Sequence, residues 1–65
     1  MKLIDLYTRQ PVINGNTIER YQRLYEIVHI DFINKSARIR EIGKLMAWTW
    51  NQDELENDFN LRFVE

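Results

Sequence analysis

The side chains in this sequence that could do chemistry are one imidazole and a short run of carboxylates. His29 is the only histidine, and the 65-residue chain has no cysteine. A lone imidazole with no thiol or hydroxyl partner at a recognisable spacing defines neither a nucleophilic site nor a metal site. We therefore name no catalytic, cofactor-binding or metal-binding residue, and we expect a protein that is not an enzyme and has no cofactor.

The carboxylates follow a helix-capping residue near the C-terminal end. They are Asp53, Glu54, Glu56 and Asp58. The run lacks the glycine and the ligand order of a calcium loop. A helical turn capped by Asn51 explains it as well, because acidic side chains stabilise the first turn of a helix. The same residues could instead imitate the phosphates of nucleic acid and so occupy a basic groove on another protein. They are therefore candidate protein-binding residues.

Two tryptophans form the second candidate for protein binding. Trp48 and Trp50 alternate along one predicted strand, so their side chains share a face. We expect this face to be the core. One of the two rings could still lie at the rim, where aromatic side chains anchor interfaces.

An alternative site would bind nucleic acid through a basic patch. Its residues are Arg20, Arg23, Arg38 and Arg40. The formal net charge of −1 gives little attraction to phosphates, and the chain has no motif of a known nucleic-acid reader. Nucleic acid is therefore a less favoured partner than protein.

The element that must position these residues is a stretch from Leu24 to Trp50, which predicts three antiparallel strands. From Leu24 to Phe32, the even-numbered residues are mostly apolar and the odd-numbered ones are mixed, as in a sheet with one buried face. The first turn is either Asn34–Lys35 or a four-residue loop from Ile33 to Ser36, with the same register. The second turn is Gly43–Lys44, which pairs residue 42 with residue 45.

These turns predict which residues lie side by side across the three strands. The predicted buried rows are Phe32–Ala37–Trp50 and Ile30–Ile39–Trp48, and the predicted polar rows are Asp31–Arg38–Thr49 and His29–Arg40–Ala47. Both predicted buried rows are apolar. This supports the register, because the turns and the face pattern are independent signals.

The segment before the meander predicts a strand at Lys2–Tyr7. Pro11 indicates an edge strand or a loop, and Asn14–Gly15 predicts a type I′ hairpin turn. Residues 17–23 have two interpretations, a short helical or irregular lead-in or an early start of the next strand near Arg20. We favour the helical or irregular lead-in because its apolar residues have helical spacing.

The segment after the meander predicts a helical turn that ends by Asn57 and a last strand at Asn60–Val64. This element order is that of SH3-like small barrels. The predicted fold is therefore mainly β, a single domain over residues 1–65, built as an SH3-like barrel on the three-stranded meander with one or two short helical turns.

Length and hydropathy indicate the compartment and the oligomeric state to expect. No apolar run has membrane-spanning length, and Asp5 interrupts the N-terminal apolar segment too early for a signal peptide. We expect a soluble cytoplasmic protein that does not bind membranes. Chains this short often rely on oligomerisation, so a homo-oligomer remains open.

Two stretches resemble short accessory proteins encoded by bacteriophages and prophages. Residues 20–37, RYQRLYEIVHIDFINKSA, are similar to the central hairpin of these proteins, and residues 50–65 are similar to their C-termini. The resemblance implies a protein that binds a host protein, such as an immune effector, and inhibits or modulates it in the bacterial cytoplasm. It implies no catalytic residue.

Overall fold

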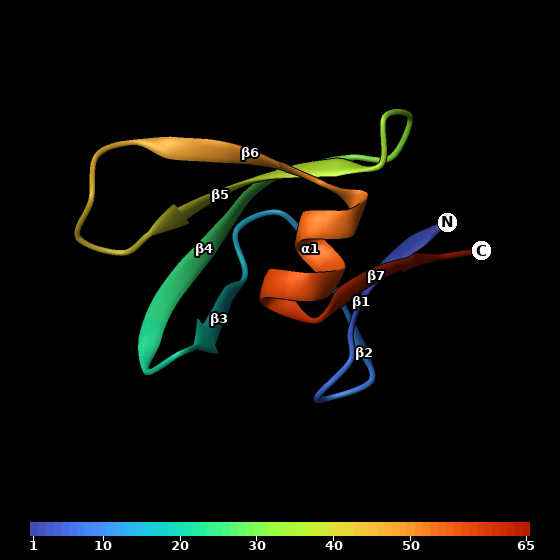
Figure 1. Ribbon diagram of the computed structural model, residues 1–65, viewed down its shortest axis with the longest axis horizontal. Helices are drawn as coiled ribbons and strands as arrows, with labels where there is room; N and C mark the ends of the chain where they lie inside the picture. Colours follow the sequence, from blue (N-terminus) through green and yellow to red (C-terminus); the bar gives the residue numbers. More distant parts are fainter.

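The computed structural model describes all 65 residues, which form two antiparallel sheets and one helix (Figure 1). The strands are β1 (Lys2–Asp5), β2 (Gln10–Val12), β3 (Thr17–Arg20), β4 (Arg23–Asp31), β5 (Ser36–Glu41), β6 (Ala47–Asn51) and β7 (Leu61–Val64), and the helix is α1 (Gln52–Phe59). One sheet has the order β2-β1-β7 and the other has the order β3-β4-β5-β6. The mainly β class is confirmed, whereas the two sheets form no closed barrel.

The three-stranded sheet joins the two ends of the chain through β1. Leu3 on β1 lies opposite both Val12 on β2 and Phe63 on β7, and all three side chains are buried. The first strand is shorter than predicted, and Pro11 lies on an edge strand, as predicted. The N- and C-termini consequently lie side by side (Figure 1).

The turn at Asn14–Gly15 is present, but it joins the two sheets and does not close a hairpin. The N–H of Asn16 donates to the carbonyl of Ile13 at 3.0 Å. Only Gly15 of the two central residues has a positive φ, +91°. A positive φ at the second central residue alone is typical of a type II turn, so the predicted type I′ hairpin is wrong.

Residues 17–23 form a β-hairpin, so the predicted helical lead-in is wrong. Arg20 at the end of β3 pairs with Arg23 at the start of β4. The two residues between them, Tyr21 and Gln22, have φ of +56° and +62°. Positive φ at both central residues is the mark of a type I′ turn, which suits the twist of the flanking strands.

The three-stranded meander of β4, β5 and β6 is confirmed, and so is the register of its second hairpin. Ile39 lies opposite Trp48 and Ala37 lies opposite Trp50, as predicted. In the first hairpin the register is wrong by two residues, because Ile30 lies opposite Ala37 and not opposite Ile39. The predicted pairs Asp31–Arg38 and His29–Arg40 therefore do not form.

The shift in the first hairpin has its cause in Asp31. Its carboxylate accepts the backbone N–H groups of Ile33 and Asn34, both at 3.0 Å. The loop therefore begins at residue 32, one position earlier than the predicted four-residue loop and two positions earlier than the predicted two-residue turn. Phe32, predicted to lie in the core, is 42% exposed and packs edge-on against Phe63 with 5.9 Å between ring centroids.

A β-bulge at Val28 further separates the observed register from the predicted one. The ladder passes from Ile27–Ile39 to His29–Arg38, so Val28 has no residue opposite it. The bulge lets Ile27 and Ile30 both face the interior although they are three residues apart. Val28 and Leu24, predicted to face inward, are exposed.

Helix α1 begins directly after β6 with the predicted cap. The side chain of Asn51 accepts the N–H of Glu54 at 2.9 Å, and the carboxylate of Glu54 accepts the N–H of Asn51 at 3.0 Å, which is a capping box. The helix is longer than predicted and ends at Asn60, whose φ of +51° is left-handed. Leu55 and Phe59, four residues apart, face the core.

The core is one cluster that the two sheets and the helix share. Its members are Leu3, Val12, Ile18, Ile27, Ile30, Ala37, Ile39, Leu55, Phe59, Leu61 and Phe63. The last strand is confirmed, since Leu61 and Phe63 are buried while Arg62 and Val64 are exposed. The eight residues of α1 are too few to cross a membrane.

Candidate protein-binding site

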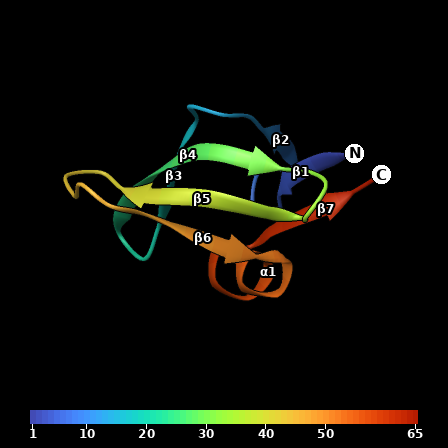
Figure 2. The same ribbon diagram turned by 90° about the horizontal axis from the view of Figure 1, so that it is seen from above.

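A hollow on the inner face of the four-stranded sheet gathers large apolar side chains. We call it the aromatic groove and define it by Tyr25 on β4, Ile39 on β5, and Trp48 and Trp50 on β6. It has a volume of about 660 Å³, within the range of sites that bury a ligand or side chains of a partner. Its rim is the β5–β6 loop, which projects at the end of the molecule opposite the termini (Figure 2).

The helix covers one end of this groove and leaves the other open. The ring of Phe59 stands edge-on to Tyr25 and to Trp50, with centroid distances of 5.2 and 5.0 Å. Trp50 is therefore half-buried against the core. Trp48 makes no such ring contact and is 61% exposed, so the prediction that it belongs to the core is wrong.

Trp50 brings an unsatisfied donor to the groove. Its indole N–H is buried and has no hydrogen-bond acceptor. A buried donor without a partner costs about 1–3 kcal/mol. The free protein therefore carries a small energetic penalty next to the hollow.

The rim of the groove is a fixed loop with apolar residues at its surface. The N–H of Lys44 donates to the carbonyl of Glu41 at 3.0 Å, and a guanidinium N–H of Arg40 donates to the carbonyl of Lys44 at 2.8 Å. Leu45 and Met46 follow, and they are 100% and 63% exposed. A hydrogen-bonded loop thus presents two large apolar side chains to solvent.

The sequence prediction missed this rim. It paired Ile42 with Leu45 as strand residues, but β5 ends at Glu41 and β6 begins at Ala47, so this pair does not form. The available signal was two apolar residues, Leu45 and Met46, directly after a glycine turn and outside every predicted buried row.

A second, smaller hollow links the groove to the predicted acidic residues. Its volume is about 360 Å³, and its lining residues are Trp48, Thr49, Trp50 and Glu54. One predicted carboxylate therefore lies beside both predicted tryptophans. This arrangement adds negative charge to one side of the exposed Trp48 ring.

Of the three other predicted carboxylates, one forms an ion pair and two do not. Glu56 forms an ion pair with Arg62 at 2.8 Å, and this contact raises the pKa of Arg62 above its ordinary value. Asp53 and Asp58 are exposed and form no ion pair. No group of three or more His, Cys, Asp or Glu side chains is placed to hold a metal ion.

The arginines of the predicted basic patch do not form one surface. Arg40 pairs with Glu26 at 2.7 Å, and Arg23 pairs more loosely with Glu41 at 3.6 Å. Arg38 is exposed and forms no ion pair. Two of these three charges are therefore already balanced by carboxylates on neighbouring strands.

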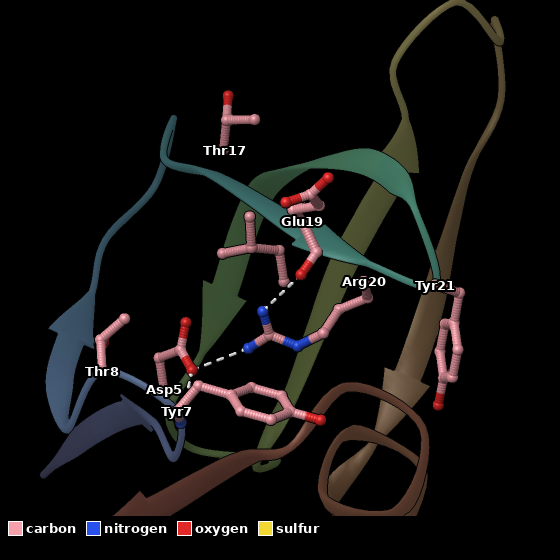
Figure 3. Close-up of a pocket in the computed structure, with 8 residues that line it drawn as sticks. Asp5, Tyr7, Thr8, Thr17, Glu19, Arg20 and Tyr21 are labelled. Carbon is pink, nitrogen blue, oxygen red and sulfur yellow. Dashed lines mark hydrogen bonds and ion pairs between the residues drawn. The ribbon is translucent and has the colours of Figure 1, made fainter.

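The fourth arginine, Arg20, belongs to the interior (Figure 3). One terminal nitrogen lies 2.8 Å from the carboxylate of Asp5, the other donates to the carbonyl of Glu19 at 2.8 Å, and Nε donates to the carbonyl of Phe59 at 2.7 Å. The ring of Tyr7 lies 4.7 Å from the guanidinium carbon. Two of the three nitrogens donate hydrogen bonds and the third forms the ion pair, so Arg20 ties the two sheets to the end of the helix.

Comparisons of the chain with protein-family models, with curated proteins and with solved structures find no match. The candidate site is therefore argued from its geometry, and the resemblance to phage-encoded proteins stays a prediction.

Proposed function

We propose that this protein is a small non-enzymatic binding module whose protein partner docks in the aromatic groove. The observation that supports this proposal is the exposed apolar set of Trp48, Leu45 and Met46 around a hollow that Tyr25 and Trp50 line. Contiguous exposed apolar patches mark interaction sites more often than free surface. Tryptophan, tyrosine and methionine are also enriched where proteins meet.

The charges beside the groove suggest the chemistry of the partner. Glu54 lies beside Trp48, and Asp53 is exposed on the same helical turn. A partner surface with one large apolar side chain and a neighbouring lysine or arginine would match both features, because a cation is attracted to a carboxylate and to the face of an indole ring.

Following the resemblance to phage-encoded accessory proteins, we propose a bacterial host protein as the partner and the host cytoplasm as the compartment. The module would inhibit or modulate that protein, for example an immune effector. For the fold, the finer proposal is an open relative of the SH3-like barrel, because both place a helical segment directly before the last strand.

Affinity capture from a bacterial host lysate tests this function. The bait carries its tag at a terminus, because both termini lie at the end of the molecule opposite the β5–β6 loop, the rim of the groove (Figures 1 and 2). We expect the wild-type bait to capture one protein in a stoichiometric amount, with or without nuclease. Leu45→Ser and Trp48→Ala should each lower the captured amount by about ten-fold or more, the effect of losing an interface anchor.

A matched control is Ile33→Ser, because Ile33 is an equally exposed apolar residue in the β4–β5 loop, outside the groove. It should capture as much partner as the wild type does. Equal capture by the two groove variants, or recovery of nucleic acid alone, would contradict the proposal. Thermal midpoints of all variants establish that each one is folded.

A further inference from the structure

The patch around the aromatic groove contains both a projection and a hollow. Leu45 projects into solvent from the rim, and Met46 follows it. The hollow directly beside them is lined by Tyr25, Ile39 and Trp48. When two copies meet around a two-fold axis, the same patch must supply both parts of the contact, because each copy faces an identical surface. This patch supplies both.

The same patch also carries one charge of each sign. Glu41 and Lys44 both line the groove, and they lie on opposite sides of the turn at Gly43. Glu41 is only loosely held by Arg23, at 3.6 Å, and Lys44 forms no ion pair. Around a two-fold axis each lysine can face the glutamate of the other copy, which gives two equivalent ion pairs.

The small size of the core gives an independent reason to expect that another chain covers this patch. Only 13 of the 65 residues are buried, and no disulfide supports the fold. Chains of this length commonly add stability by oligomerisation. Among the apolar side chains around the groove, Leu45, Met46 and Trp48 are exposed and would be covered by a second copy.

We propose that two copies of this chain form a two-fold dimer through the aromatic groove, with Leu45 of each copy in the groove of the other. Lys44 of each copy faces Glu41 of the other. The dimer stands apart from the function proposed above, because it needs no other protein. If both are correct, the second copy and the partner compete for one surface, and partner capture weakens as the protein becomes more concentrated.

Sedimentation velocity and light scattering of the purified 8.0 kDa chain test the dimer. We expect a concentration-dependent doubling of mass between about 1 µM and about 1 mM, the range of typical reversible self-association. Leu45→Ser should stay monomeric throughout this range. Ile33→Ser, the matched control outside the groove, should dimerise like the wild type.

Charge reversal gives a sharper test. Lys44→Glu places two glutamates together at both contacts, and Glu41→Lys places two lysines together, so each variant alone should self-associate about ten-fold more weakly or worse. An equimolar mixture of the two variants restores opposite charges at both contacts and should form a heterodimer. A structural defect in either variant would not be repaired by mixing.

Three outcomes would overturn the dimer. The wild-type chain could stay monomeric at every concentration, in which case the groove is free for another protein. The dimer could survive both Leu45→Ser and charge reversal, which would place the contact on another face. The mixture of charge variants could fail to associate although both are folded by circular dichroism.

Discussion

Arg20 carries a positive charge into the interior, where oxygens from both sheets and the helix surround it. Asp5 supplies the countercharge at 2.8 Å, and the Phe59 carbonyl accepts from Nε at 2.7 Å. Removing one member of a buried pair leaves the other charge without a partner. Arg20→Ala should therefore lower the free energy of unfolding by about 3–5 kcal/mol, which urea denaturation would measure.

Arg38→Ala is the control for this prediction, because Arg38 is exposed on the same sheet and forms no ion pair. Its effect on the free energy of unfolding should stay within about 0.5 kcal/mol. Replacing both partners, as in Asp5→Leu with Arg20→Met, should recover part of the loss since no charge stays buried. Equal stability of Arg20→Ala and Arg38→Ala would show that the pair does not stabilise the fold.

Asp31 makes the β4–β5 loop sensitive to acid. Hydrogen bonds from the backbone and side chain of Asn34 hold the pKa of Asp31 below its ordinary value of 3.8. A pKa that is lower in the folded state means that the charged carboxylate stabilises the fold above about pH 3.8. This contribution is lost as the pH falls through the lower, folded-state pKa.

A titration of the Asp31 carboxyl carbon by NMR measures this effect directly. We expect a midpoint below 3.8 in the wild-type protein. In Asn34→Ala the midpoint should rise, because the side-chain donor is gone while the backbone donors remain. A wild-type midpoint at or above 3.8 would contradict the role of Asp31 in closing the loop.

At the scale of elements, the capping box connects the helix to the groove. Asn51 caps α1, and α1 holds Phe59 against Trp50. Asn51→Ala should cost about 0.5–2 kcal/mol of unfolding free energy, measured by thermal or urea denaturation. The near-ultraviolet circular dichroism of the tryptophans should weaken as the first helical turn frays.

Asn57→Ala is the matched control for Asn51→Ala, since it makes the same chemical change at an exposed position inside the same helix. Alanine is the better helix former, so this variant should be as stable as the wild type or slightly more stable. If the two variants were equally stable, the cap would contribute nothing to the helix.

Elements with local signals could be predicted from the sequence. The turn at Gly43 placed Ile39 opposite Trp48 correctly, because the longer link observed between β5 and β6 is centred on the same residues and keeps the predicted register. The cap at Asn51 and the alternation of Leu61 and Phe63 were equally local. None of these features depends on a segment far away in the chain.

The bulge in the first hairpin depended on distant contacts and could not be predicted in the same way. The backbone of Ile27 exchanges hydrogen bonds with Gly15 and Asn16, and the N–H of Ile30 donates to the side chain of Asn14 at 2.9 Å. These contacts surround the bulge at Val28. A sequence pattern with period two contains no information about such an extra residue.

The candidate site was predicted only in part for a related reason. The tryptophans and Glu54 were identified, and they share one hollow. The exposure of Trp48 depends on how much of the sheet α1 covers, which is a property of the packed molecule. Arg20 was assigned to a surface because its partner Asp5 lies on a distant strand of the other sheet.

At the scale of the whole molecule, the elements that stabilise the fold lie apart from the proposed binding surface. The three-stranded sheet and both termini lie at one end, and the β5–β6 loop lies at the other (Figures 1 and 2). This loop supplies the rim of the groove. The buried ion pair of Arg20 and Asp5 joins the two sheets between these ends. A partner can therefore bind in the groove without disturbing the ion pair that joins the two sheets.

Nucleic acid is the alternative partner for the arginines. The formal net charge is −1, Arg20 is buried, and Arg23 and Arg40 already face carboxylates. Of the four arginines of the predicted patch, only Arg38 is then free to displace counterions from a phosphate backbone. Binding to single- or double-stranded oligonucleotides at physiological salt should be weaker than about 10 µM, measured by fluorescence anisotropy.

Arg38 is the residue to test in this experiment, because it is the one member of the predicted patch that is exposed and without an ion pair. Any residual binding should fall as salt rises, since each phosphate contact releases counterions. Arg38→Glu should abolish it and leave the thermal midpoint unchanged. Sub-micromolar binding that Arg38→Glu removes would instead make the outer face of the sheet a nucleic-acid interface and reverse the order of the two functions.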